Sequence, residues 1–200
     1  LLGLINHHQP QRSIVFVNTK RSAELLNDYL QANNFKTALL SGDVPQEKRQ
    51  RLLNDFQENR ANILIATDVA ARGLHIPDVS HVFNYDLPQD VEDYVHRIGR
   101  TARFGASGEA ISFICEEYAY SMPDIEEYIG EKLPVESISD ELLAKDIIEP
   151  DPNRPRERVQ SPQKRSDKPR PKRSRPAPAK KTENSDPASA PESPAPQETQ

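Results

Sequence analysis

The chain has 200 residues and a formal net charge of −5, but the charge is unevenly distributed. Residues 1–150 hold 14 basic and 24 acidic residues, a net of −10, whereas residues 151–200 hold 12 basic and 7 acidic residues, a net of +5. The single cysteine, Cys115, excludes a disulfide framework and a cysteine-based zinc site, and it fits a reducing, cytoplasmic setting. No apolar run is long enough to span a bilayer, so no membrane association is expected.

The first ten residues are predicted to be the end of a helix or interdomain linker, because Leu1, Leu2 and Leu4 are spaced like the last turn of a helix. We interpret the chain as a fragment of a longer polypeptide. From residue 11 onward, β-branched runs alternate with amphipathic segments. This alternation is typical of a parallel sheet with helices on its faces.

The predicted strands are short apolar runs at residues 14–17, 37–40, 63–66, 81–85 and 108–115. The predicted helices lie at about residues 22–33, 45–58, 89–98 and 123–129. Their order predicts an α/β fold: a three-layer, open parallel sheet with helices on both faces, formed by one domain at residues 11–150. Ligand contacts in such sheets gather at the carboxyl ends of the strands.

Polar and glycine residues follow four of these predicted strands. They are Asn18 and Thr19, then Ser41 to Asp43, then Thr67, Asp68, Arg72 and Gly73, and finally Asp86. Hydroxyls, glycine amides and arginines at strand ends suit phosphate binding, although each residue alone is more often a turn or helix cap. Their occurrence after successive strands favours phosphate binding.

Residues 94–105 place Arg97, Arg100 and Arg103 at three-residue intervals beside a histidine and two glycines. Guanidinium groups are planar, permanently charged and able to donate paired hydrogen bonds to phosphate. The run therefore indicates arginine-finger chemistry at a nucleotide γ-phosphate.

Residues 11–135 resemble the second RecA-like domain of DEAD-box RNA helicases. The resemblance rests on four ordered motifs, at residues 14–19, 46–49, 65–74 and 94–105. It implies a RecA-like fold and the activity of an ATP-dependent RNA helicase. It also implies three partners: RNA, a preceding RecA-like domain of the same protein, and an RNA-degrading endonuclease complex.

The resemblance implies specific roles on the nucleotide side. Arg100 and Arg103 would reach the γ-phosphate, His96 would couple the nucleotide and RNA sites, and Gly73 would lie at the nucleotide. His75 stands where an aspartate commonly meets the ribose, so looser ribose recognition is expected. Ala102 likewise replaces a glycine of the family pattern.

On the RNA side, the resemblance implies contacts to the sugar-phosphate backbone of a single strand. The matching positions are Thr19, Gly42, Arg49, Thr67, Arg72 and Gly73. Asp68 is expected to order its loop rather than to touch a ligand. Backbone contacts carry no base information, so RNA binding should be sequence-tolerant and salt-dependent.

The sequence contains neither a phosphate-binding Gly-x-x-x-x-Gly-Lys-Ser/Thr loop nor an Asp-Glu-Ala-Asp motif. In the family these groups lie in the preceding domain, which this chain lacks, so ATP and Mg²⁺ are expected to be held mainly there. Residues 1–200 alone are predicted to hydrolyse no ATP. No metal site is predicted, because His7, His8 and His81 are not spaced like one, and Cys115 is interpreted as a small core residue.

Three functions remain open: one half of an RNA helicase active in RNA turnover, a non-catalytic RecA-like docking module for an RNA-decay or ribonucleoprotein complex, and a DNA-directed helicase. Retention of Arg100 and Arg103 favours a helicase over a docking module. The residues at 71–74 and 94–100 match the motifs of the RNA helicase family, which favours RNA over DNA.

Residues 151–200 hold 11 of the 18 prolines and no aromatic residue, so the tail is predicted to be disordered. Its first part, residues 154–181, carries a net charge of +10, and residues 182–200 carry four acids and no base. Two interpretations remain: an RNA-tethering arm that acts through counterion release, which we favour, and a solvated linker.

Overall fold

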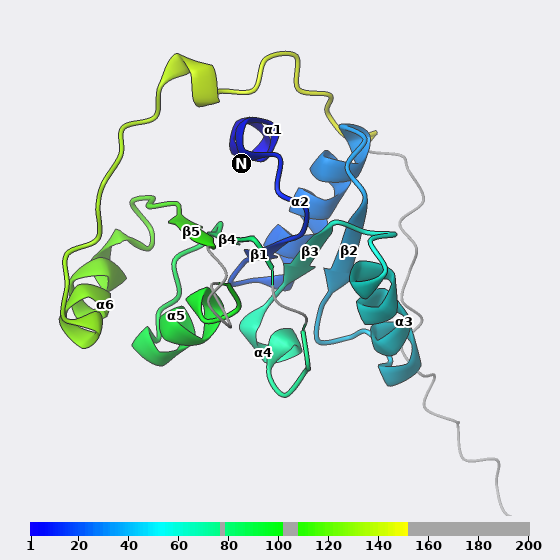
Figure 1. Ribbon diagram of the computed structural model, residues 1–200, viewed down its shortest axis with the longest axis horizontal. Helices are drawn as coiled ribbons and strands as arrows, with labels where there is room; N and C mark the ends of the chain where they lie inside the picture. Colours follow the sequence, from blue (N-terminus) through cyan, green and yellow to red (C-terminus); the bar gives the residue numbers. More distant parts are fainter. Residues whose placement is uncertain (77–78, 102–107, 152–200) are drawn as a thin grey trace, which may run out of the picture. The chain divides into compact units, whose positions relative to one another are not determined.

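The computed structural model describes residues 1–76, 79–101 and 108–151. Its centre is a five-stranded parallel sheet in the order β2-β3-β1-β4-β5 (Figure 1). The strands are β1 (Ser13–Phe16), β2 (Thr37–Leu40), β3 (Ile63–Ala66), β4 (His81–Asn84) and β5 (Glu109–Ser112). The predicted α/β fold is confirmed, while Ala102, Arg103 and the predicted tail lie outside the described residues.

Helices cover both faces of the sheet (Figure 1). On one face lie α1 (Leu2–His8) and α2 (Lys20–Ala32), and on the other lie α3 (Gln46–Gln57), α4 (Asp68–Ala71) and α5 (Val91–Ile98). The 3₁₀ helix η2 (Ala119–Ser121) leads into α6 (Met122–Ile129), which packs against α5, and a second, η3 (Asp140–Leu142), follows. The expected three layers are therefore present. No helix in the described ranges combines the length and apolarity needed to cross a membrane.

An apolar core forms on each face of the sheet because the side chains of each strand alternate between the faces. Phe16 points to the core shared with Leu53 and Phe56 of α3, whereas Val15 points to the core shared with Leu30 of α2. Since the central strands are covered on both sides, every residue of β1 and β3 is buried. This explains why continuous apolar runs mark these strands in the sequence.

The last strand is shorter than predicted. It ends at Ser112 instead of running to residue 115, and its exposed edge position leaves little apolar surface to bury. Cys115 is consequently exposed, so its interpretation as a core residue is wrong.

The segment after α6 lies against the helices of the first face. The Asn33 amide donates to the Ile148 carbonyl at 2.9 Å, and the Ile148 N–H donates to Asn33 Oδ1 at 3.0 Å. Gly3 of α1 is buried against η3 so closely that a β-carbon there would lie 1.8 Å from the Leu142 carbonyl oxygen. A glycine is required at this contact because no side chain fits between the two backbones.

Candidate functional site

Arg72, Gly73, His96 and Arg100 of the predicted site lie at the carboxyl edge of the sheet, where a pocket of about 290 Å³ opens between α4 and α5. Its lining comes from the end of β1, from α4 and the loop after it, and from α5. These residues are Phe16, Asp68, Ala71, Arg72, Gly73, Asp93, His96, Arg97 and Arg100.

Arg97 is the structural centre of this edge, with 1% of its side chain exposed. Its Nε and Nη2 donate to the two carboxylate oxygens of Asp68 at 2.8 and 2.6 Å. It also donates to Asn18 Oδ1 at 2.8 Å and to the Asp86 carbonyl at 2.6 Å. The guanidinium carbon lies 5.2 Å from the centroid of the Phe16 ring, within range of a cation–π contact.

These bonds tie together the segments that follow β1, β3 and β4. A buried guanidinium is tolerated because its charge is paired and its donors are occupied. Asp68, which follows β3, is thereby joined to α5 through its pair with Arg97. The sequence did not single out Arg97 for this role, because nothing in the local sequence distinguishes a buried arginine from the exposed arginines beside it.

Asp86 belongs to the same hydrogen-bond network. Its carbonyl accepts from Arg97, and its side-chain Oδ2 accepts from the Asn18 backbone N–H at 2.8 Å. Burial raises the pKa of the Asp86 carboxyl, although the Asn18 hydrogen bond and the Arg97 charge oppose that shift. The Asn18 side chain in turn donates to the Leu87 carbonyl at 2.8 Å. The loops after β1 and β4 are thus held together by hydrogen bonds within the chain.

A second set of contacts joins α4 to α5 at the mouth of the pocket. Arg72 Nη2 donates to Asp93 Oδ1 at 3.0 Å, and His96 Nδ1 lies 3.9 Å from the same oxygen. Arg72 and His96 are mostly exposed, whereas Asp93 is mostly buried. One carboxylate therefore links a predicted RNA contact to the residue expected to couple the two sites.

Arg100 lines the pocket just beyond the end of α5. The backbone on either side of it is fixed: its N–H donates to the Arg97 carbonyl at 3.1 Å, and its carbonyl accepts from the Val79 N–H at 3.2 Å. Thr101 is buried and donates its hydroxyl proton to the Val79 carbonyl at 2.8 Å. Arg103, the second predicted arginine finger, lies outside the described residues.

Gly73 has a φ of 73°, in the left-handed region, so glycine suits this turn between α4 and the following loop. His75 is exposed nearby and is not among the residues that line the pocket. The structure therefore brings Gly73, His96 and Arg100 together and leaves His75 at the side.

The remaining predicted RNA contacts lie along the same edge. Thr19 and Gly42 are exposed after β1 and β2, and Thr19 caps α2 by accepting from the Ser22 N–H at 3.0 Å. Thr67 is 8% exposed after β3 and makes no side-chain cap bond. The Nε of Arg49 on α3 is buried and has no hydrogen-bond partner among the described residues.

Comparison with known proteins places the chain in a family. Residues 1–105 match the helicase conserved C-terminal domain. The ATP-dependent RNA helicase RhlB of Xanthomonas campestris pv. campestris (strain B100) is 56% identical over 160 residues, 80% of this chain and 27% of that protein. RhlB of Idiomarina loihiensis is 53% identical over 161 residues, 80% of this chain and 38% of that protein.

Solved structures agree in fold and in sequence. The E. coli DEAD-box protein SrmB, bound to regulator of ribonuclease activity A, superposes with a TM-score of 0.65 at 42% identity, over 70% of this chain and 81% of that one. S. cerevisiae Dbp5 bound to RNA and ADP BeF3 gives a TM-score of 0.59 at 40% identity, over 66% of this chain and 37% of that one.

The five-stranded parallel sheet, with its arginine-lined pocket at the carboxyl edge, is a RecA-like helicase domain. The family model matches more than half of the chain, and the similar proteins are RNA helicases and a DEAD-box protein. The chain belongs to the helicase conserved C-terminal domain family and is the C-terminal helicase domain of a DEAD-box RNA helicase, similar to bacterial RhlB. It spans 27% and 38% of the length of the two RhlB relatives.

Proposed function

We propose that this domain supplies Arg100 and Arg103 to ATP and Mg²⁺ held mainly by a preceding RecA-like domain of the same protein, while it grips single-stranded RNA for local duplex unwinding. The observation that carries the proposal is the position of Arg100 in the pocket between α4 and α5, on a backbone held on both sides. An arginine finger works by presenting positive charge where negative charge develops during phosphoryl transfer.

The buried neighbour of Arg100 supports this role. Arg97 is held by Asp68, so the end of α5, which leads to Arg100, is fixed by contacts within the domain. Preorganised charge is effective because it costs no rearrangement at the moment of reaction. Arg97 thus acts as a positioning residue, and Arg100 as the catalytic one.

Coupling between RNA and nucleotide would run through Asp93. Arg72 and His96 lie at the same carboxylate oxygen, so an RNA phosphate that draws Arg72 away would free Asp93 to bind His96 more closely. His96 borders the same pocket as Arg100. RNA binding and ATP hydrolysis would therefore depend on each other.

The RNA grip would use the edge from Gly42 to Arg72. Thr19, Gly42 and Thr67 follow neighbouring strands, and Arg49 lies in the first turn of α3, which follows β2. We further propose a role in cytoplasmic RNA turnover within an RNA-degrading endonuclease complex. The supporting fact is indirect: the similar protein SrmB is bound to a regulator of ribonuclease activity.

The test is RNA-stimulated ATP hydrolysis by the complete protein that contains this domain. Arg100→Ala should lower kcat on the order of 1000-fold while RNA affinity stays unchanged, because its charge is needed only in the transition state. Arg72→Ala should instead weaken RNA binding and reduce the salt dependence of that binding by about one phosphate contact.

Arg60→Ala is the matched control, because Arg60 is an exposed arginine just after α3. It should leave both measurements unchanged. Wild-type hydrolysis by Arg100→Ala would refute the arginine-finger role and would favour the non-catalytic docking module. RNA binding that is unaltered by Arg72→Ala would refute the proposed grip.

A further inference from the structure

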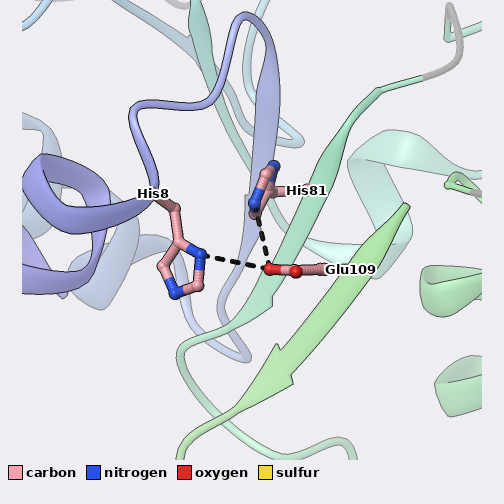
Figure 2. A group of neighbouring side chains, drawn as sticks. All are labelled: His8, His81 and Glu109. Carbon is pink, nitrogen blue, oxygen red and sulfur yellow. Dashed lines mark ion pairs between the residues drawn. The ribbon is translucent and has the colours of Figure 1, made fainter. Parts of the chain in front are cut away.

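Three side chains with metal-binding chemistry, His8, His81 and Glu109, meet where β4 and β5 begin (Figure 2). The pocket lies at the other ends of the strands. Glu109 Oε2 lies 3.1 Å from His8 Nδ1 and 3.2 Å from His81 Nε2. The candidate ligand atoms all lie within 4.8 Å of one another. The histidines are 24% and 14% exposed, and the glutamate side chain is 58% exposed.

Three separate elements deliver these residues. His81 begins β4 and Glu109 begins β5, and the two are direct partners in the parallel register. His8 is the last residue of α1, which packs on the face of the sheet that α2 also covers. Because residues 8, 81 and 109 are far apart in the chain, the spacing of histidines in the sequence could not reveal this group.

The hydrogen bonds behind His81 fix its tautomer. Ser80 Oγ donates its only proton to the Arg12 carbonyl at 2.9 Å, so it must accept the hydrogen bond that it shares with His81 Nδ1 at 3.0 Å. A proton therefore occupies Nδ1. In the neutral ring, Nε2 then carries a lone pair that faces the Glu109 carboxylate.

The 3.2 Å between His81 Nε2 and Glu109 Oε2 suits an ion pair, and it equally suits two ligand atoms of one divalent metal ion. An imidazole whose other nitrogen donates to a fixed oxygen is the usual arrangement of a metal-binding histidine. The chain from His81 through Ser80 to the Arg12 carbonyl is such an outer shell.

We propose that His8, His81 and Glu109 bind one Zn²⁺ ion. Two imidazole nitrogens and one carboxylate oxygen suit zinc, which takes three protein ligands plus water where a site is open to solvent. Bond lengths of about 2.0–2.1 Å place the ligand atoms of a tetrahedral ion about 3.3 Å apart. Two of the three separations, 3.1 and 3.2 Å, are already close to that value.

The bound ion would fasten the end of α1 to two strands. Apart from this site, α1 is held by apolar contacts around Ile5 and by its close approach to η3. Zinc would therefore make the position of α1 depend on metal, at a place remote from the nucleotide pocket. The proposal is independent of the proposed catalytic function.

The experiment is a zinc titration of the metal-stripped 200-residue chain by calorimetry, with Co²⁺ as a spectroscopic probe. One Zn²⁺ per chain should bind, Co²⁺ should give the visible absorption of a tetrahedral site, and hydrogen exchange of the α1 amides should slow. His81→Ala and Glu109→Gln should each weaken zinc binding more than about 100-fold, and Ser80→Ala should weaken it about 10- to 100-fold as an outer-shell change.

The matched controls are His7→Ala, beside His8 on α1, and Cys115→Ser, which removes the only thiol. Both should bind zinc like the wild-type chain. The proposal is overturned if the folded wild-type chain binds no Zn²⁺ at about 100 μM, which is about a hundredfold above a micromolar Kd. It is equally overturned if Glu109→Gln and Ser80→Ala, shown by circular dichroism to be folded, bind zinc as tightly as the wild type.

Discussion

Replacing Arg97 by methionine tests whether the candidate site is held by its own buried ion pair. The change keeps an apolar stem of similar length but removes the charge and all four hydrogen bonds of the guanidinium. The Asp68 carboxylate then loses its partner while only 21% of its side chain reaches solvent. Asn18 and the Asp86 carbonyl each lose one donor as well.

Removing one member of a buried ion pair costs about 3–5 kcal/mol. Because Asp68 can regain some water, we expect the lower end, about 3 kcal/mol, which corresponds to a fall in Tm of about 6–12 °C for a domain of this size. Urea unfolding of the 200-residue chain, followed by circular dichroism, measures the change. Arg60→Met is the control, since its exposed pairs are worth about 1 kcal/mol or less.

A double-mutant cycle separates the pair from the other contacts. Adding Asp68→Asn to Arg97→Met should restore part of the lost stability, because the unpaired carboxylate is removed. A loss below about 1 kcal/mol for Arg97→Met, or simple additivity of the two changes, would refute the structural role assigned to the pair.

Three further changes have defined outcomes. Gly3→Ala should lower Tm and speed hydrogen exchange in η3, although alanine favours helices, because its β-carbon would strike the Leu142 carbonyl; an unchanged Tm would contradict that contact. Burial raises the pKa of Asp86, so the folded state keeps this proton to higher pH than the unfolded chain. The stability that Asp86 contributes should therefore be lost as pH rises from about 4 through the raised pKa, so in urea titrations the wild type should lose stability relative to Asp86→Asn over this window. Deleting residues 151–200 from the complete protein should weaken RNA binding at low salt and flatten its salt dependence; unchanged affinity would favour the solvated linker.

The sheet could be predicted because its strands are buried on both sides. The apolar runs at residues 37–40 and 63–66 coincide with β2 and β3, and helices between them require the parallel order. The edge strand β5 was predicted too long, because its regular pairing with β4 ends at Ser112, and the only backbone bond to β4 beyond it among the described residues is from the Phe113 N–H to the Asn84 carbonyl at 2.9 Å. Cys115 was misplaced for the same reason.

The site was predicted only in part. Strand ends identified the edge where Arg72, His96 and Arg100 lie, because parallel strands all present their carboxyl ends there. The burial of Arg97 and the meeting of His81 with Glu109 depend on contacts between distant segments, which no local pattern encodes. The single turn α4 was also missed, since four residues are too few for a helical period.

The most direct test of a divided active site is a comparison of ATP hydrolysis by residues 1–200 alone and by the same residues joined to the ATP-binding domain, both saturated with RNA. The chain alone should show no RNA-stimulated turnover, because its sequence contains no phosphate-binding loop, and the joined protein should show turnover that is lost with Arg100→Ala. RNA-stimulated turnover by residues 1–200 alone would contradict the division of the site between two domains.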